Sequence, residues 1–188
     1  YHLALSHYSN QSLSAFTLTP TVIPTITYGV DIEGRTSSVQ AGSSSLVTST
    51  ARGPSNQISS VAFGNGDTDI YGYDSDLRMT QFAFSVGGNS ITGGLSYNAN
   101  GTVAGKTVSD PFTPSTSETC AYGYDAWARM STAKCSSFNS TYAYDRYGNI
   151  SKTGTTSFTP TYSATTNRMM AIGAVTPTYD ANGNVLTD

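Results

Sequence analysis

One short phrase recurs along the chain and constrains its fold more than any other feature. It consists of a tyrosine or other apolar residue, a spacer, Tyr-Asp or Tyr-Asn, two variable residues, Gly or a substitute, and then a polar and an apolar residue. Full copies occupy residues 28–35, 71–79, 95–101, 122–130, 142–150 and 178–185, and weaker copies occupy 52–55 and 162–169. A repeat found this often predicts a repeated structural unit.

The spacing of the copies indicates the size of that unit. The position equivalent to the aspartate falls at residues 31, 53, 74, 98, 125, 145, 163 and 180. A period of about 20 residues suits two strands of about 5–6 residues with two turns. We therefore expect about eight β-hairpins in succession.

The residues after each tyrosine have the chemistry of a tight turn. Asp or Asn at the first position and Gly at the fourth are typical of a type I turn followed by a residue with positive φ. The pairs are Asp31 with Gly34, Asn98 with Gly101, Asp145 with Gly148, and Asp180 with Gly183. Leu77 and Ala128 replace the glycine after Asp74 and Asp125, so those two turns are expected to be altered or modestly strained.

The tyrosines are predicted to be the packing material of the repeat. In pairs such as Tyr122 and Tyr124, both rings lie on one face of a strand, because side chains alternate with period two. Rings from successive units would then stack as a ladder across the sheet. The ladder positions are Tyr28, Tyr73, Tyr97, Tyr124, Tyr144 and Tyr179.

Composition supports an all-β fold. Only 11% of residues are charged, against roughly 25% in an average soluble domain. The chain has 18 Gly and 13 Tyr, which suit turns and strands better than amphipathic helices.

This repeat resembles the YD repeat of RHS-repeat proteins, a family that includes bacterial polymorphic toxins, toxin-complex components and animal teneurins. The resemblance covers about residues 26–188. It implies an antiparallel sheet of successive hairpins that spirals into a hollow shell, which in some members encloses a C-terminal toxin. Two features depart from the family. Asp110-Pro111 lacks the context of the Asp-Pro-x-Gly-Leu cleavage segment, and about eight units are fewer than a closed shell normally uses.

The first 25 residues precede the repeats. Alternating apolar and polar residues over 12–20 predict a half-buried strand, and Pro20 and Pro24 favour an edge or entry position for it. We expect residues 1–25 to form this entry segment and residues 26–188 to form the repeat array, all within one domain.

Cys120 and Cys135 are the two cysteines of the chain. If the segment between them is a hairpin, the two thiols face each other across paired strands, which permits a disulfide. The alternative is two separate buried thiols, and a metal site is disfavoured because further ligands are lacking. A disulfide would place the protein in an oxidising, extracytoplasmic compartment.

No motif in the sequence indicates catalysis or a cofactor. Nucleophile elbows, phosphate-binding loops and zinc-protease motifs do not occur. His2 and His7 are expected to face solvent, and the turn-forming role accounts for Asp74, Asp125, Asp145 and Asp180. The acidic segment 64–69 resembles a calcium loop only faintly, so a solvated loop is preferred.

The remaining side chains of interest lie at the turns. Arg35, Arg78, Arg129 and Arg168 follow the turns, where stacking on tyrosines or pairing with turn carboxylates is expected. Trp127 is expected to pack on a neighbouring unit rather than to bind sugar.

A net charge of −3 argues against nucleic-acid binding, and no apolar run is long enough to span a membrane. The leading hypothesis is a non-enzymatic structural segment of a secreted or cell-surface bacterial protein. The alternatives are a subunit of an extracellular fibre that joins head to tail through sheet edges, and a carbohydrate-binding module. The fibre would come first if these residues were a complete natural product. An enzyme is the weakest alternative.

Overall fold

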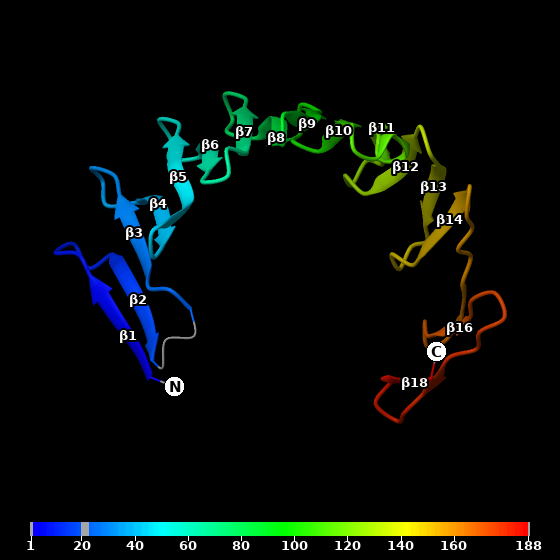
Figure 1. The fold of residues 1–188 in the computed structure, drawn as a ribbon. Helices are drawn as coiled ribbons and strands as arrows, with labels where there is room; N and C mark the ends of the chain where they lie inside the picture. The colour runs from blue at the N-terminus through cyan, green and yellow to red at the C-terminus, as the bar shows by residue number, and fades with distance from the viewer. Residues whose placement is uncertain (1, 20–22, 188) are drawn as a thin grey trace. The chain divides into compact units, whose positions relative to one another are not determined.

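The computed structural model describes residues 2–19 and 23–187, and these are built almost entirely from antiparallel β-strands (Figure 1). Fourteen strands form one sheet in which each strand pairs with its neighbours in chain order. They are β1 (His2–His7), β2 (Leu13–Thr19), β3 (Ile26–Val30), β4 (Thr36–Ala41), β5 (Ser44–Arg52), β6 (Ile58–Phe63), β7 (Thr68–Tyr73), β8 (Met79–Val86), β9 (Asn89–Tyr97), β10 (Val103–Ser109), β11 (Glu118–Tyr124), β12 (Met130–Cys135), β13 (Asn139–Tyr144) and β14 (Ile150–Gly154).

Two short hairpins follow the large sheet. One pairs β15 (Thr161–Tyr162) with β16 (Met169–Ala171), and the other pairs β17 (Thr178–Tyr179) with β18 (Val185–Thr187). A single turn of 3-10 helix, η1 (Pro114–Thr116), interrupts the link between β10 and β11. Among the described residues, no helix has the length and apolarity needed to cross a bilayer.

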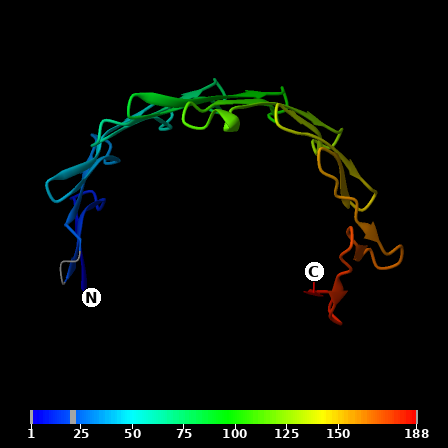
Figure 2. The ribbon, with the colours of Figure 1, turned by 45° about the vertical axis from the view of Figure 1, so that its right-hand side comes forward.

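Contacts divide the chain into two units, residues 1–95 with 108–117, and residues 96–107 with 118–188. In each unit the hairpins lie side by side in a single layer, as the rotated view in Figure 2 shows. A single layer cannot bury side chains on both faces. Accordingly, the buried residues in the described part of the chain are Cys120, Ala133, Cys135 and Ser140, all of which lie on β11, β12 and β13.

The all-β hairpin array predicted from the repeat is confirmed. All eight aspartate-equivalent positions, from residue 31 to residue 180, lie at the start of a hairpin turn. The strand register shifts next to these turns, for example between Gly29 and Val30 and between Gly72 and Tyr73. Such a shift is the bulge that a type I turn needs in order to close an antiparallel hairpin.

The N-terminal segment differs from expectation. The alternating residues form β2, but β2 pairs with β1 on one side and with β3 on the other, so it is not an edge strand. Strand β1 occupies the end of the sheet instead. A turn with positive φ at Gln11 joins β1 to β2. The sequence did not reveal this ninth hairpin because its turn lacks both the aspartate and the glycine. Pro20 lies outside the described residues.

Candidate functional site

The repeated turn has the same backbone geometry in most hairpins. At Asp31, the backbone N–H donates to the carbonyl of Arg35 at 2.9 Å, and the N–H of Gly34 donates back to the carbonyl of Asp31 at 3.0 Å. The same pair of bonds closes the turns that begin at residues 8, 53, 74, 98, 125, 145 and 180. The turn at Ser163 is one residue longer, since its N–H reaches the carbonyl of Arg168.

The turn carboxylates act as hydrogen-bond acceptors. Oδ1 of Asp74 accepts the backbone N–H groups of Asp76 and Arg78, and Oδ2 accepts Nε of Arg78 at 2.8 Å. Asp31 and Asp125 repeat this arrangement with their own arginines, and Asp145 and Asp180 use the side-chain amides of Asn149 and Asn184. These aspartates therefore hold the turn in shape.

These bonds also determine how the carboxylates titrate. The N–H groups of Arg78 and Asp76 and the Arg78 guanidinium keep the pKa of Asp74 below its ordinary value, against a partial desolvation. For Asp125 and Asp145 desolvation is the largest single influence and raises the pKa, but the hydrogen bonds together outweigh it and the net shift is downward. These groups are thus stabilised as anions, which does not suit a general acid at neutral pH.

Turns with asparagine use a second arrangement. In the turn at Asn98, the third residue, Asn100, accepts the N–H of Thr102 at 3.2 Å, and the Asn98 amide donates to the Thr102 hydroxyl. Asn10 accepts the N–H of Ser12 in the same way. The turn-stabilising hydrogen bonds predicted for Asn98 are therefore shared between Asn98 and Asn100.

The fourth turn residue has positive φ whether or not it is glycine. The angles are 79°, 85°, 85° and 91° at Gly34, Gly101, Gly148 and Gly183. Leu77 and Ala128 adopt 63° and 59°. In this left-handed region a Cβ atom is crowded by the backbone, so both residues carry strain.

In several hairpins the tyrosine directly before the turn connects its hairpin to the preceding one. Its hydroxyl donates to the carbonyl of the first residue after the preceding turn, at 2.8–2.9 Å. The pairs are Tyr73 with Ile58, Tyr124 with Val103, Tyr144 with Met130 and Tyr179 with Met169. Tyr8 instead bonds forward, to the carbonyl of Tyr28.

The arginines after the turns complete this connection. The guanidinium of Arg129 is bonded to Asp125 and lies 4.1 Å from the ring centroid of Tyr144 in the next hairpin. Arg168 lies 5.3 Å from the ring of Tyr179. Successive hairpins are thus linked by tyrosine hydroxyl groups and by guanidinium groups over tyrosine rings. Ring-to-ring contacts are found instead between Tyr71 and Phe84 and between Phe82 and Phe84.

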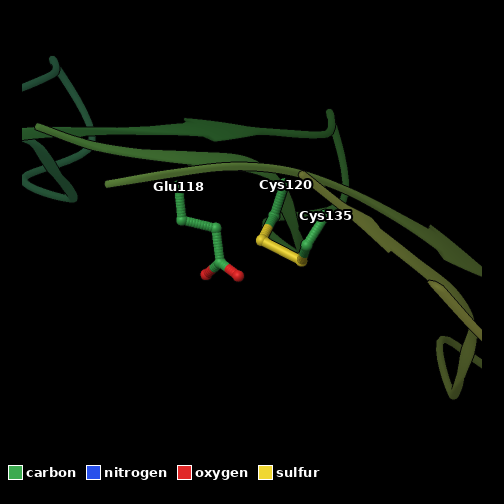
Figure 3. A group of neighbouring side chains, drawn as sticks. All are labelled: Glu118, Cys120 and Cys135. Atoms are coloured by element: carbon green, nitrogen blue, oxygen red, sulfur yellow. A yellow bond between two sulfur atoms is a disulfide. The ribbon is translucent and has the colours of Figure 1, made fainter. Parts of the chain in front are cut away.

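The two cysteines form a disulfide, as the hairpin between them predicted. Cys120 and Cys135 are directly paired across β11 and β12, with Cα atoms 3.9 Å apart and both side chains buried. Figure 3 shows Glu118 on the same side of the sheet as the disulfide, because it lies two residues before Cys120 on the same strand.

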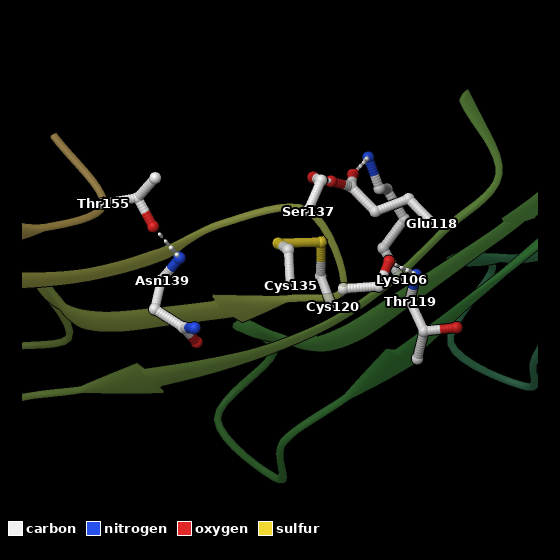
Figure 4. Close-up of a disulfide and its surroundings, with 9 residues drawn as sticks. Lys106, Glu118, Thr119, Cys120, Cys135, Ser137, Asn139 and Thr155 are labelled. Carbon is white, nitrogen blue, oxygen red and sulfur yellow. Dashed lines mark hydrogen bonds and ion pairs between the residues drawn. A yellow bond between two sulfur atoms is a disulfide. The ribbon is translucent and has the colours of Figure 1, made fainter. Parts of the chain in front are cut away.

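Glu118 is held by two neighbours, which Figure 4 shows around the disulfide. The Ser137 hydroxyl donates to Oε1, and the Lys106 ammonium lies 3.1 Å from Oε2. These two contacts lower the pKa of Glu118. Although Glu118 and the two sulfur atoms lie within 4.8 Å of one another, the sulfurs are bonded to each other and are not thiolates, the form that binds metal. Sequence reasoning missed Glu118, which strand alternation places beside Cys120.

The remaining candidates from the sequence are the two histidines, the acidic segment 64–69 and Trp127. His2 and His7 are exposed on β1. The acidic segment 64–69 contains a hairpin turn that leads into β7, and Asp67 accepts the N–H of Gly87 at 3.1 Å. It borders an open depression of about 430 Å³ between Leu46, Phe63 and Val86. The packing predicted for Trp127 is wrong, because its side chain remains 78% exposed.

Comparison with known proteins supports the fold. No protein-family profile matches the chain, and no curated protein matches it in sequence. Solved structures do match. They include the Tc holotoxin pore of Photorhabdus luminescens carrying a TccC3 mutation, with 12% identity and a TM-score of 0.73, and a TcdB2-TccC3 complex without its hypervariable C-terminal region, also with 12% identity and 0.73. The fold is that of an RHS-type hairpin sheet.

These matches differ greatly from the chain in length. Each covers 97% of this chain but only 12% of the matched toxin chain. A complex titled TcdB2-TccC3-Cdc42 matches over the same shares, with a TM-score of 0.71. At 12% identity the likeness extends to the arrangement of strands, which a hairpin repeat can keep while most side chains change.

Proposed function

We propose that this chain is a non-enzymatic scaffold, a stretch of RHS-type hairpins from a secreted or cell-surface bacterial protein. The observation that carries the proposal is the repeated link between hairpins. From Tyr73 to Tyr179, tyrosine hydroxyls bond to the carbonyl group that follows the preceding turn. A structure in which one hairpin after another is bonded to its predecessor in this way is suited to building an extended surface.

The polar residues that could take part in catalysis are instead engaged in structural contacts, which supports the same function. The turn aspartates are engaged by backbone N–H groups and by arginine or asparagine side chains, and Glu118 is engaged by Ser137 and Lys106. The disulfide is consistent with an oxidising compartment outside the cytoplasm. The similarity to Tc toxin components supports a bacterial, secreted setting.

The proposal is tested by reading the coding sequence on both sides of these residues. A shell segment requires further Tyr-x-Tyr-Asp units at a period of about 20 residues on at least one side. Flanking sequence without such units would contradict the shell role and would leave the fibre alternative.

The fibre alternative has its own supporting observation. Strand β1 is the first strand of the sheet order and pairs only with β2 among the described residues, and all six of its residues are exposed. An edge of this kind has unpaired backbone groups that a strand from another copy can complete. Self-association through such edges would give a head-to-tail polymer.

Electron microscopy of the purified chain separates the two functions. Filaments that lengthen with protein concentration support the fibre. A small monodisperse species at all concentrations contradicts it. Replacing Leu3 with proline removes a backbone donor from β1, and this variant should form no filaments if the edge joins the copies.

A further inference from the structure

We propose that Glu118, Cys120 and Cys135 form a Zn²⁺ site when the two cysteines are reduced. One ligand atom from each of these side chains lies within 4.8 Å of the other two, and residues 2–19 and 23–187 contain no other group of this kind. The three side chains point to the same side of the sheet (Figure 3). The disulfide and the metal ion are therefore alternative ways of joining the same two strands.

The pairing of the cysteines suits a shared metal ion. Cys120 and Cys135 lie directly opposite each other, and the N–H of Cys135 donates to the carbonyl of Phe138 rather than across to Cys120. Side chains are closest in cross-strand pairs that lack mutual hydrogen bonds. Two thiolates on one tetrahedral zinc ion are about 3.8 Å apart, because each Zn–S bond is about 2.3 Å long. The Cβ atoms of a disulfide are also about 3.8 Å apart, so side-chain rotation alone gives reduced sulfurs this separation.

Glu118 supplies the third ligand. It lies two residues before Cys120 on β11, and alternate residues of a strand share a face. Its side chain is 17% exposed, the Ser137 hydroxyl donates to Oε1, and the Lys106 ammonium lies 3.1 Å from Oε2 (Figure 4). A carboxylate oxygen has two lone pairs, so it can accept one such bond and still bind a metal ion. Outer contacts of this kind orient the ligands of metal sites.

The charges favour a divalent ion with an affinity for sulfur. Two thiolates and one carboxylate carry three negative charges, Lys106 adds one positive charge, and a divalent ion brings the sum to zero. Thiolates select zinc over magnesium, calcium and manganese, which prefer oxygen ligands. Both cysteines are buried, which shields the metal–sulfur bonds from water. One water molecule would complete the tetrahedral set, as in zinc sites with three protein ligands.

The metal form precedes the disulfide, because cysteines enter a chain as thiols. Zinc binding replaces two S–H bonds with two Zn–S bonds and releases two protons. Oxidation then needs a disulfide-containing oxidant. One cysteine thiolate attacks a sulfur of that oxidant and expels a first thiolate, and the other cysteine attacks the mixed disulfide and expels a second. Two electrons thus pass to the oxidant, Zn²⁺ is released, and the hairpin β11–β12 stays closed.

The test uses Co²⁺ as the probe and the protein reduced with a trialkylphosphine. The phosphine takes up an oxygen atom from water as it is oxidised, and it adds no thiol that would compete for the metal. Thiolate-to-cobalt charge transfer absorbs in the near ultraviolet, and tetrahedral Co²⁺ absorbs in the visible. We expect both signals to saturate at one Co²⁺ per chain and to disappear when Zn²⁺ is added. The oxidised protein should give neither signal.

Variants identify the ligands. Glu118→Gln keeps the size of the side chain but removes its charge, and it should weaken Co²⁺ binding by about tenfold or more. Glu33→Gln is the matched control, because Glu33 lies in a turn of the β3–β4 hairpin, and it should leave the affinity unchanged. The Cys120→Ala/Cys135→Ala double variant should give no charge-transfer band.

Stability provides a second readout that does not depend on the cobalt spectrum. A ligand that binds the folded form alone raises the melting temperature. The reduced parent protein should therefore melt at a higher temperature with excess Zn²⁺ than with EDTA. This difference should be absent in the double variant and in the oxidised parent.

Any of three results would overturn the proposal. The first is a reduced parent protein that gives no charge-transfer band with excess Co²⁺. The second is equal Co²⁺ affinity of the Glu118→Gln variant and the parent, because the carboxylate would then not be a ligand. The third is saturation at one Co²⁺ per two chains, which would indicate a thiolate site shared between two copies.

Discussion

The hydroxyl of Tyr144 donates a hydrogen bond of 2.8 Å to the carbonyl oxygen of Met130, and this bond joins two consecutive hairpins. Met130 is the first residue after its turn, and Tyr144 is the last residue before the next one. The Arg129 guanidinium covers the same tyrosine ring. The hydroxyl and the ring of one residue thus contact two consecutive residues of the preceding hairpin.

Replacing Tyr144 with phenylalanine should lower the free energy of unfolding by about 1 kcal/mol, because one hydrogen bond is lost. The matched control is Tyr142→Phe on the same strand. The Tyr142 hydroxyl makes no hydrogen bond to any described residue, so this change should have little effect. Urea unfolding monitored by circular dichroism measures both values, and equal effects would show that the interhairpin bond adds no stability.

Replacing Ala128 with glycine should stabilise the protein by about 1 kcal/mol, because Ala128 has a φ of 59° where a Cβ atom is crowded. Ala121→Gly on β11 is the control. In a strand, glycine gains no relief of strain and should lower stability by about 0.5–1 kcal/mol. Thermal melts of the two variants should therefore shift in opposite directions, and a loss of stability in both would refute the strain at Ala128.

Reducing the disulfide should lower the melting temperature. Cys120 and Cys135 are 15 residues apart, and closing a loop of that length stabilises a protein by about 3 kcal/mol in the chain-entropy model. The Cys120→Ala/Cys135→Ala double variant should melt at a lower temperature than the oxidised parent and should not respond to reductant. Free thiols in the native protein under oxidising conditions would exclude the bond.

Acid should destabilise the sheet through the turn carboxylates. The folded pKa values of Asp74, Asp125 and Asp145 lie below the ordinary value of 3.8. Their contribution is therefore complete above about pH 4 and is lost as the pH falls through the depressed values. Urea midpoints at pH 7, 4 and 2 should show this decrease, and Asp145→Asn should reduce its size. An unchanged acid response in that variant would assign the effect to other groups.

Much of the fold follows from the sequence because the turn is a local structure. Asp or Asn with Gly three positions later marks many of the turns, and the period then gives the approximate number of units. The turn at residues 8–12 escaped prediction because Gln11 takes positive φ without being glycine. Its geometry is set by pairing between β1 and β2, and a pattern of single residues does not contain that information.

The links between hairpins were harder to predict than the hairpins. Alternation predicts tyrosines on one face of a strand, but it does not reveal that tyrosine hydroxyls reach a backbone carbonyl of the preceding unit. That contact depends on the register between strands whose bonded residues are 10 to 21 positions apart in the sequence. Trp127 was misjudged for a related reason, because a single-layered sheet provides no second surface against which a turn residue can pack.

In the turns that begin at Asp125 and Asp145, the side chains of the two central residues take no part in the bonds that define the hairpin. Mutations can therefore change these turn residues while the β-sheet that carries the turns stays the same. A row of interchangeable tips along one edge would let such a protein acquire new surface specificities through point mutations, much as antibody loops vary above a constant core.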